Sequence, residues 1–325
     1  MAPPDPTAVL HDLVRPGMER LHRSLTELAE IDDPILSPLL SQVLPGSGKR
    51  MRPALALGIA RVGEADPDAM NDMAIGVELL HTASLVHDDV VDESDTRRGS
   101  ATLFTKIGNQ LAVLVGDYLF SRAAQACVAT GNLRVVQLFA ETLGAMAQGQ
   151  VDEANAHQAG RTWQRVSRDR YYRTIWGKTA SLFVLASHGA ALLAGLDEPS
   201  VQGCRRFGEK LGLAFQVVDD ILDFTSTETA LGKPVGNDLR QGTTTLPVIL
   251  LRDQDLANGR FESVFEQEDV EAQIRLVQRS GAIDAAYAEA EGLIREAREA
   301  LSVLPAGAER SALAALAEYV LRRRM

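Results

Sequence analysis

Two acidic clusters with the same spacing are the residues of this sequence best suited to chemistry. The first runs from Asp88 to Asp92 as Asp-Asp-Val-Val-Asp, and the second runs from Asp219 to Asp223 as Asp-Asp-Ile-Leu-Asp. Carboxylates one helical turn apart share a face and repel each other unless a cation lies between them. Mg²⁺ suits such a place, because it takes one or two carboxylates together with water and substrate phosphates. One such cluster alone would more simply be a solvated helix face. Two copies, each in the middle of an apolar helix, predict metal-binding faces on two facing helices.

Basic residues near these clusters indicate what the metal ions would hold. Arginine pairs with phosphate oxygens through parallel hydrogen bonds, and lysine acts on them as a point charge. Each basic residue alone would more simply be a surface charge, but together with the acidic clusters they predict a diphosphate site. The basic residues in question are Lys49, Arg52, Arg97, Arg98, Lys178 and Lys233.

The helical pattern of the chain sets the frame for these residues. Apolar residues recur at three- and four-residue steps, for example across 71–93, whereas alternating strand patterns are scarce. Breaks between helices are expected at 45–48, 130–132, 232–234 and 304–307. The sequence predicts an all-α fold, a single large helical bundle around a central cavity, with one domain over residues 1–325.

Charge and hydropathy exclude other classes. The net charge of −11 argues against a nucleic-acid binder, which would show a basic face. No signal peptide is indicated, and the most apolar stretch, 182–196, is interrupted by polar residues and too short for a membrane span. We therefore expect a cytoplasmic protein without stable membrane insertion. Cys127 and Cys204 are expected to be reduced and structural, and the basic run Arg322 to Arg324 is expected to be a solvated tail.

Six motifs occur in a fixed order between about residues 45 and 250: GSGKRMRP, ELLHTASLVHDDVVDESDTRRG, GKTASLF, FQVVDDILDF, GKPVGNDL and TLP. With these motifs the chain resembles the trans-isoprenyl diphosphate synthase (polyprenyl synthetase) family, and within it the bacterial octaprenyl and related polyprenyl diphosphate synthases. The resemblance implies the isoprenoid synthase fold and a prenyltransferase that condenses isopentenyl diphosphate head to tail with an allylic diphosphate. It also implies three Mg²⁺ ions per active site and a homodimer.

The family motifs imply a role for each matching position. Asp88 and Asp92 would hold Mg²⁺ that binds the allylic diphosphate, and Asp219, with Asp223 nearby, would hold a further Mg²⁺. The allylic diphosphate would be contacted by Arg97, Lys178, Thr179, Gln216 and Lys233. The isopentenyl diphosphate would be held by Lys49, Arg52, His81 and Arg98. The residues expected to take part in catalysis are therefore Asp88, Asp92, Asp219, Asp223, Lys178 and Lys233.

The chain departs from the family pattern at two places. Thr243 follows Gly242 where relatives often have a lysine, and Gln150 precedes Glu153 where many relatives have the reverse order. One phosphate contact is therefore expected to be missing or to come from another residue.

Product length is expected to depend on residues before Asp88. Ala83 and Ser84 are small where short-chain relatives often carry a bulky aromatic residue, and Leu80 lies further back along the same helix. Phe139 precedes Gln150 by eleven positions, about 16 Å along a helix, and is the candidate floor of the product tunnel. Together with the resemblance to octaprenyl diphosphate synthases, these positions imply a medium or long, octaprenyl-like product of about C30 to C45.

Three alternatives remain open. The chain could be a shorter-chain geranylgeranyl diphosphate synthase, a class I terpene cyclase, or a non-catalytic partner subunit of a heteromeric synthase. A cyclase usually carries Asn/Asp-x-x-x-Ser/Thr-x-x-x-Glu where this chain has its second aspartate cluster. Non-catalytic subunits typically lose the aspartate clusters, whereas both clusters are intact here.

Overall fold

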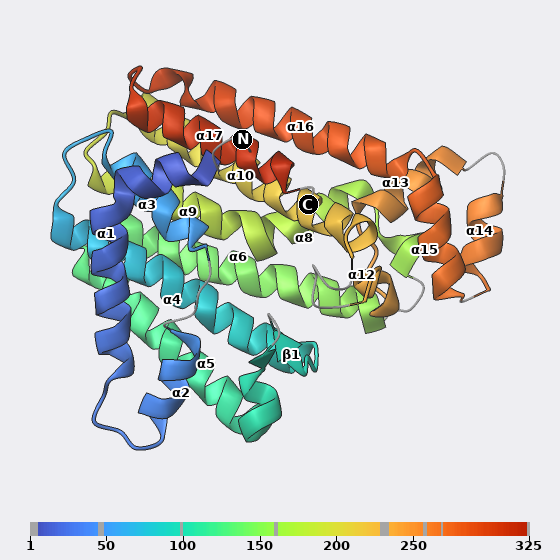
Figure 1. The fold of residues 1–325 in the computed structure, drawn as a ribbon, viewed down its shortest axis with the longest axis horizontal. Coiled ribbons are helices and arrows are strands. Elements are labelled where there is room, and N and C mark those ends of the chain that lie inside the picture. Colours follow the sequence, from blue (N-terminus) through green and yellow to red (C-terminus); the bar gives the residue numbers. More distant parts are fainter. Residues whose placement is uncertain are drawn as a thin grey trace. The chain divides into compact units, whose positions relative to one another are not determined.

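The computed structural model describes residues 6–44, 49–97, 100–158, 162–227, 234–255, 259–267 and 269–323. Most of these residues lie in helices, and the strands among them form a single hairpin of two strands with two residues each (Figure 1). The all-α expectation is confirmed.

The elements of the first half run from α1 to α6. In chain order they are α1 (Pro6–Ala29), α2 (Leu36–Val43), α3 (Met51–Ala60), α4 (Pro67–Val91), β1 (Thr96–Arg97), β2 (Ser100–Ala101), α5 (Leu103–Ala129) and α6 (Leu133–Gln158). The predicted break at 130–132 falls between α5 and α6, as expected.

The described part of the second half is also mostly helical. Its elements are α7 (Thr162–Arg165), α8 (Arg168–Ile175), the π-helical turn η1 (Trp176–Ala180), α9 (Ser181–Leu193), α10 (Glu198–Thr225), α12 (Asn237–Arg240), α13 (Leu246–Asp255), α14 (Arg260–Phe265), α15 (Val270–Arg279), α16 (Ala282–Ala300), the 3₁₀ turn η2 (Leu301–Val303) and α17 (Ala308–Arg322). The predicted break at 304–307 separates η2 from α17. The breaks at 45–48 and 232–234 fall wholly or partly outside the described residues.

The chain divides into two compact units, each made of several segments. The first comprises Met1–Leu143, Leu182–Gly208 and Ala300–Leu316, and the second comprises Gly144–Ser181, Glu209–Glu299 and Ala317–Met325. The single-domain organisation over residues 1–325 stays a prediction.

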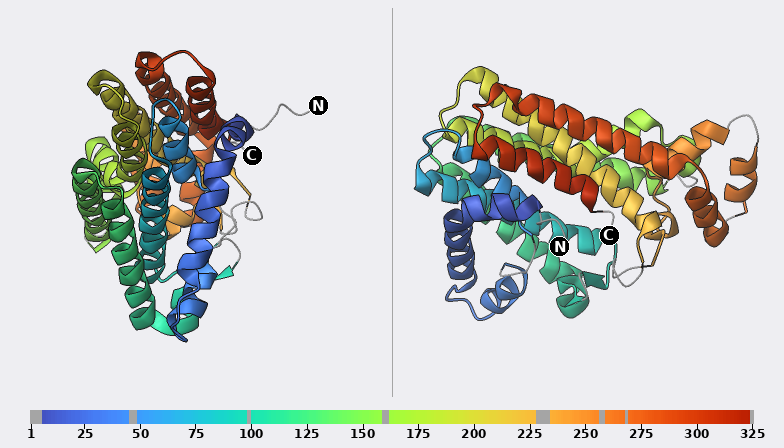
Figure 2. Two further views of the ribbon diagram at one scale, coloured as in Figure 1. Left: turned by 90° about the vertical axis from the view of Figure 1, so that its left-hand side faces the viewer. Right: turned by 45° about the horizontal axis from the view of Figure 1, so that its top comes forward.

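In the first unit, α4 is the central helix. Its N-cap Asp66 accepts a hydrogen bond from the backbone N–H of Ala69 at 3.0 Å, and Pro67 occupies the first turn, where proline favours a helix start. α4 packs along α5 and against α3 and α1, and α4 and α5 lie side by side in the different views (Figures 1 and 2). The contact with α5 is close at Gly116, where an added Cβ would lie 2.1 Å from Nε2 of His87. His87 directly precedes Asp88, so this contact fixes the end of α4 that carries the first acidic cluster.

In the second unit, a separate apolar cluster joins α13, α14 and α15. The rings of Phe261 and Phe265 stack with their centroids 4.1 Å apart, and Trp163 meets Phe261 edge-on. Phe224, near the end of α10, is fully buried in the same cluster. Full burial of an apolar side chain of this size contributes about 1.5–3 kcal/mol to the stability of the fold. The cluster therefore anchors the end of α10, which carries the second acidic cluster.

Two features bear on the cellular setting. Among the described helices, α5 alone is long and apolar enough to cross a membrane, and 33% of its most apolar window is buried. One such helix is weak support for a membrane span, because helices of folded domains pass the same test. Cys127 and Cys204 are free and buried, and burial raises the pKa of each thiol to about 12. Both cysteines are therefore in the thiol form at neutral pH, as predicted.

Candidate active site

The first acidic cluster lies at the carboxy-terminal end of α4. The helix ends at Val91, and Asp92 is its C-cap residue, with its backbone N–H donating to the carbonyl of Asp88 at 2.8 Å. The prediction of a mid-helix position is therefore wrong for this cluster. The carbonyl end of a helix carries partial negative charge, so carboxylates there are unfavourable without a cation. The observed position strengthens the requirement for a positive ion.

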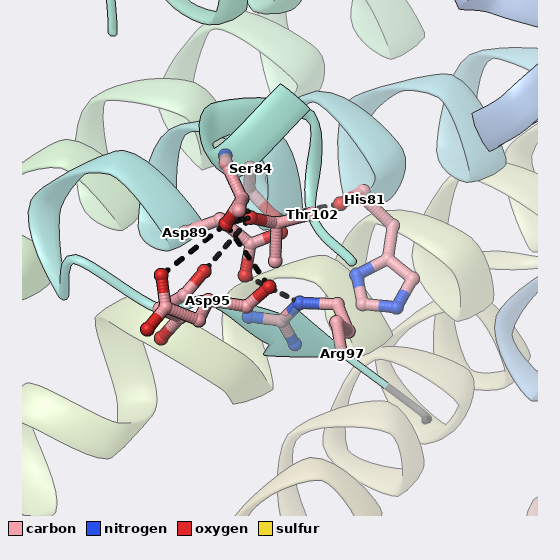
Figure 3. Close-up of polar contacts among 8 residues, drawn as sticks. His81, Ser84, Asp89, Asp95, Arg97 and Thr102 are labelled. Atoms are coloured by element: carbon pink, nitrogen blue, oxygen red, sulfur yellow. Dashed lines mark hydrogen bonds and ion pairs between the residues drawn. The ribbon is translucent and has the colours of Figure 1, made fainter. Parts of the chain in front are cut away.

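The middle aspartate of this cluster is the most buried of the three. Asp89 is 6% exposed and accepts a hydrogen bond from Nε of Arg97 at 2.7 Å (Figure 3). Burial raises the pKa of the Asp89 carboxyl, and the Arg97 guanidinium opposes that rise. Asp88 is partly buried and Asp92 is exposed. The outer carboxylates thus lie nearer to solvent, whereas Asp89 orients Arg97.

A tight turn after α4 brings Arg97 back to the helix. Arg97 pairs with Ser100 in the β1–β2 hairpin, and the backbone N–H of Ser94 donates to the carbonyl of Asp89 at 2.9 Å. Thr102 closes the turn, because its hydroxyl donates to the carbonyl of Ser94 at 2.8 Å and caps α5 (Figure 3). Arg98 lies outside the described residues.

A second basic group predicted from sequence is assembled beside α4. Nη1 of Arg52, on α3, lies 3.2 Å from Nε2 of His81, on α4. The Arg52 guanidinium also stacks over the Phe183 ring, 4.5 Å from its centroid. Lys49 is exposed and lies three residues before Arg52. The structure therefore brings together Arg52 and His81, two of the residues expected to hold one diphosphate.

The π-helical turn η1 carries Lys178 and Thr179. π-helical turns widen a helix by one residue and occur often at functional sites. Two glycines permit this turn to touch α6: an added Cβ at Gly177 would lie 2.6 Å from the carbonyl oxygen of Ala145, and one at Gly149 would lie 2.8 Å from the backbone nitrogen of Lys178. The close approach fixes the backbone of η1.

Glu153 of α6 forms an ion pair with Lys178. The inverted order of Gln150 and Glu153 therefore leaves a carboxylate next to the lysine. This contact orients the Lys178 ammonium, and it also offsets its charge until an anionic ligand competes for it.

The second acidic cluster lies in the last two turns of α10, and it too has a buried middle residue. Asp220 is 3% exposed; Oδ2 accepts from the Tyr171 hydroxyl at 2.6 Å, and Oδ1 accepts from the Gln216 amide at 2.8 Å. Burial raises the pKa of Asp220 well above its usual value, and the charge of Asp238 adds to the rise. Thr179 donates its hydroxyl hydrogen to Oε1 of Gln216 at 2.7 Å. One chain of hydrogen bonds thus joins α8, α10 and η1.

Tyr171 was not among the residues predicted from sequence. Its only sequence signal is its position seven residues before Lys178, two helical turns, which names no partner. The tyrosine is buried, and burial together with the Asp220 charge raises its pKa well above the usual value.

Tyr171→Phe is expected to lower the free energy of unfolding by about 1–3 kcal/mol, because a buried carboxylate oxygen loses its donor. Urea denaturation followed by circular dichroism measures the change. Tyr172→Phe is the matched control, since its partner Glu289 keeps an ion pair with Arg168 at 2.8 Å. Equal stability of Tyr171→Phe and the parent protein would show that the Tyr171 hydroxyl does not hold Asp220.

Asp223, the last residue of the second cluster, is 1% exposed. Oδ2 of Asp223 accepts a hydrogen bond from the backbone N–H of Asp238 at 3.0 Å. The backbone carbonyl of Asp223 accepts another from the backbone N–H of Gly236 at 2.8 Å. These bonds hold the start of α12 on the end of α10. Lys233 lies outside the described residues.

Asp219 is the outward residue of the second cluster, with 39% of its side chain exposed. Its Oδ1 accepts a hydrogen bond from Nη2 of Arg323 at 2.7 Å. The Arg323 side chain is only 23% exposed, so the prediction of a solvated basic tail is wrong for this residue. Local sequence patterns could not predict this contact, because 104 positions separate the two residues.

The donor set suits a hard divalent cation. Among the residues that the structure describes, no three His, Cys, Asp or Glu side chains form a ready-made metal cage. Mg²⁺ does not require one, because substrate phosphates and water complete its coordination. Asp219 already holds a positive group, Arg323, which acts as a stand-in cation. Asp88, Asp92 and Asp219 therefore fit Mg²⁺ ligands.

The residues expected to set product length are placed in the first unit. Leu80 and Ala83 are fully buried on α4, Ser84 is partly buried, and Phe139 on α6 is 6% exposed. Near them, α9 fits closely, since an added Cβ at Gly189 would meet Met73 of α4 and Leu138 of α6.

Comparison with known proteins decides the family. Residues 33–278 match the family described as Polyprenyl synthetase. The chain belongs to the polyprenyl synthetase family. The resemblance inferred from the motifs is confirmed, and this polyprenyl synthetase is a prenyltransferase of the trans-polyprenyl diphosphate synthase class.

Individual relatives of this polyprenyl synthetase differ in the product they are named for. Heptaprenyl diphosphate synthase component 2 of Geobacillus stearothermophilus is 38% identical over 86% of this chain and 88% of that protein. All-trans-nonaprenyl-diphosphate synthase (geranyl-diphosphate specific) of Rhodobacter capsulatus is 40% identical over 86% of this chain and 87% of that protein. The crystal structure of polyprenyl synthase from Caulobacter crescentus CB15, complexed with calcium and isoprenyl diphosphate, has a TM-score of 0.90 at 33% identity and covers 98% of each chain.

Proposed function

We propose that this polyprenyl synthetase is a Mg²⁺-dependent enzyme that adds isopentenyl diphosphate repeatedly to an allylic diphosphate, giving a medium or long product. The arrangement of the two clusters carries the proposal. In each, the middle aspartate (Asp89 or Asp220) is buried and hydrogen-bonded, while Asp88, Asp92 and Asp219 lie nearer to solvent. The relatives named for heptaprenyl and nonaprenyl products support a length in this range.

Each step breaks the carbon–oxygen bond of the allylic diphosphate and forms a carbon–carbon bond to isopentenyl diphosphate. Mg²⁺ bound by the outward aspartates would stabilise the negative charge that develops on the departing diphosphate. Basic and polar residues of the chain would orient that group and share its charge. The allylic diphosphate would be contacted by Arg97, Lys178, Thr179, Gln216 and Lys233, and the isopentenyl diphosphate by Lys49, Arg52, His81 and Arg98. The proton released from the new chain would pass to the departing diphosphate.

Two ion pairs and one hydrogen bond already orient three of these basic groups. Asp89 holds Arg97, Glu153 holds Lys178, and His81 lies against Arg52. A group that is held before the ligand arrives loses less conformational entropy on binding. The chain thus prepares its cations for two diphosphates.

A direct assay tests the function. Purified protein is incubated with labelled isopentenyl diphosphate and one short allylic primer at a time, with Mg²⁺ or with EDTA, and the products are sized. We expect elongation in the presence of Mg²⁺ and no elongation in the presence of EDTA. Release of diphosphate without consumption of isopentenyl diphosphate would identify a terpene cyclase. No reaction by the purified chain would favour a partner-dependent subunit, as the name component 2 of the Geobacillus relative suggests for that protein.

Ala83→Phe is expected to shorten the product by at least one isoprene unit, and Phe139→Ala is expected to lengthen it. Ala83 is fully buried on α4, so a ring there would either fill space meant for product or overpack the core. Chromatography of the dephosphorylated products measures the lengths.

Ala74→Phe is the matched control, because Ala74 is equally buried on α4 and has no predicted role in length. It should lower stability by about 1–3 kcal/mol without changing the product. If Ala83→Phe and Phe139→Ala both leave the product unchanged, neither residue lines the growing chain.

The homodimer implied by the family has a candidate surface on α5. Leu111, Leu114 and Val128 of this helix are exposed, and Leu133 is exposed just after it. Exposed apolar side chains gathered on one helix are typical of an interaction surface. Light scattering should give twice the chain mass of 35.1 kDa. Flotation of the protein with lipid vesicles would instead indicate a membrane contact and would contradict the cytoplasmic assignment.

A further inference from the structure

The carboxy-terminal end of α17 places a basic residue on the second acidic cluster. Arg323 directly follows α17, and its Nη2 donates to Oδ1 of Asp219 at 2.7 Å. Its guanidinium carbon lies 4.3 Å from the centroid of the Phe215 ring. Phe215 and Asp219 are four residues apart on α10 and share a face. Two different interactions therefore hold one guanidinium on the face of α10 that carries a proposed metal ligand.

One nitrogen of the same guanidinium makes no hydrogen bond to the described residues. Nη1 of Arg323 is buried and has no hydrogen-bond partner among the residues that the structure describes. Buried donors are nearly always paired, and an unpaired donor costs free energy that offsets part of the gain from the other contacts. This cost lowers the net gain from holding Arg323 at Asp219, which favours its displacement by another cation.

We propose that Arg323 is a positioning residue for the second acidic cluster: it holds the Asp219 carboxylate as a resident counter-ion, and the divalent cation must displace it. The inference rests on the proposed function, because it takes Asp219 to be a metal ligand. It extends that function by giving a residue at the end of the chain a part in setting metal affinity. Two groups that compete for one carboxylate are linked, so Arg323 weakens metal binding and bound metal releases Arg323.

Mn²⁺ binding to the full chain in the presence of inorganic diphosphate tests this competition. Free Mn²⁺ is measured by electron paramagnetic resonance. Arg323→Gln removes the charge but keeps a polar side chain, and it is expected to tighten Mn²⁺ binding about two- to fivefold, as loss of a partly exposed ion pair predicts. In an Asp219→Asn background, the same substitution at Arg323 should have no effect, because the carboxylate that is competed for is gone.

Arg322→Gln is the matched control. It changes the net charge equally, but Arg322 is exposed and lies 3.9 Å from Glu318. We expect its Mn²⁺ binding to equal that of the parent. Equal tightening by Arg322→Gln and Arg323→Gln would reduce the effect to net charge and overturn the proposal. Unchanged or weaker Mn²⁺ binding by Arg323→Gln would overturn it as well.

Thermal unfolding supplies a second, independent readout. In EDTA, Arg323→Gln should lower the Tm by a few degrees, and saturating Mn²⁺ with diphosphate should remove most of that difference. Arg323→Lys keeps the charge but lacks the planar group that stacks on Phe215, so its Tm should lie between those of the parent and Arg323→Gln. This variant also provides the test if Arg323→Gln does not fold. A parent protein that elongates substrate and binds Mn²⁺, with no effect of Arg323, would refute only this inference. Failure of the parent to bind Mn²⁺ would refute the proposed function too.

Discussion

Replacing Asp88 with alanine is expected to lower the turnover number by about 10²- to 10³-fold and to leave the fold intact. The carboxylate is only partly buried at the negative end of α4, where a carboxylate is unfavourable without a cation and would serve as a metal ligand. Removing one group that stabilises developing charge typically costs this much in rate. Isopentenyl diphosphate incorporation at saturating Mg²⁺ measures the loss, and circular dichroism with thermal unfolding reports on the fold.

The neighbouring aspartate provides the contrast. Asp89→Ala should lower both activity and stability, since it removes the partner of Arg97 from a buried position. Asp32→Ala, at an exposed aspartate of the first unit, should change neither. If Asp88→Ala retained near-normal activity, the first cluster would not hold the metal that the reaction needs. If Asp88→Ala unfolded as readily as Asp89→Ala, the distinction between outward and inward aspartates would be lost.

Gly177→Ala is expected to lower turnover by about 10²-fold, because misplacement of a catalytic group by about 1 Å has an effect of this size. A Cβ at residue 177 would lie 2.6 Å from the carbonyl oxygen of Ala145 and 3.3 Å from Cα of Gly149, so backbone must move. That movement would shift Lys178 and Thr179, the next two residues of η1. Steady-state kinetics should show a fall in kcat and a rise in KM for the allylic diphosphate.

Gly144→Ala is the matched control for this prediction. Gly144 lies on α6 close to the same contact, but an added Cβ there would meet nothing within 4 Å. Alanine in place of an exposed helical glycine should raise stability by about 0.5–1 kcal/mol and leave turnover unchanged. Normal kinetics of Gly177→Ala would show that the geometry of η1 does not position the two residues.

Spacing was enough to predict the helical class, and the family motifs indicated two residues that the structure brings together. The breaks at 130–132 and 304–307 fall between helices, and Arg52 lies against His81. Both agreements rest on local signals, since helix breakers and motif order are written in short stretches of sequence. The roles of the individual site residues stay predictions.

What spacing could not predict is which carboxylate of a cluster turns inward. Asp89 and Asp220 repeat the chemistry of their neighbours, and burial together with a hydrogen-bond donor from outside the cluster distinguishes them from Asp88, Asp92 and Asp219. Tyr171 reaches Asp220 across 49 positions, and Arg323 reaches Asp219 across 104. Such contacts depend on packing between helices, for which no local pattern exists. The same reason explains the wrong expectation for Arg323.

The burial of Cys127 and Cys204 makes this chain behave almost as a cysteine-free protein towards labelling reagents. Burial raises the pKa of both thiols to about 12, so the thiolate, which is the reactive form, is scarce at neutral pH. The sequence contains no other cysteine. A single cysteine introduced on the exposed surface would therefore take up a spin label or fluorophore selectively, without removal of the native residues. Distances between labelled positions could therefore be measured in solution, with and without metal, on variants that keep both native cysteines.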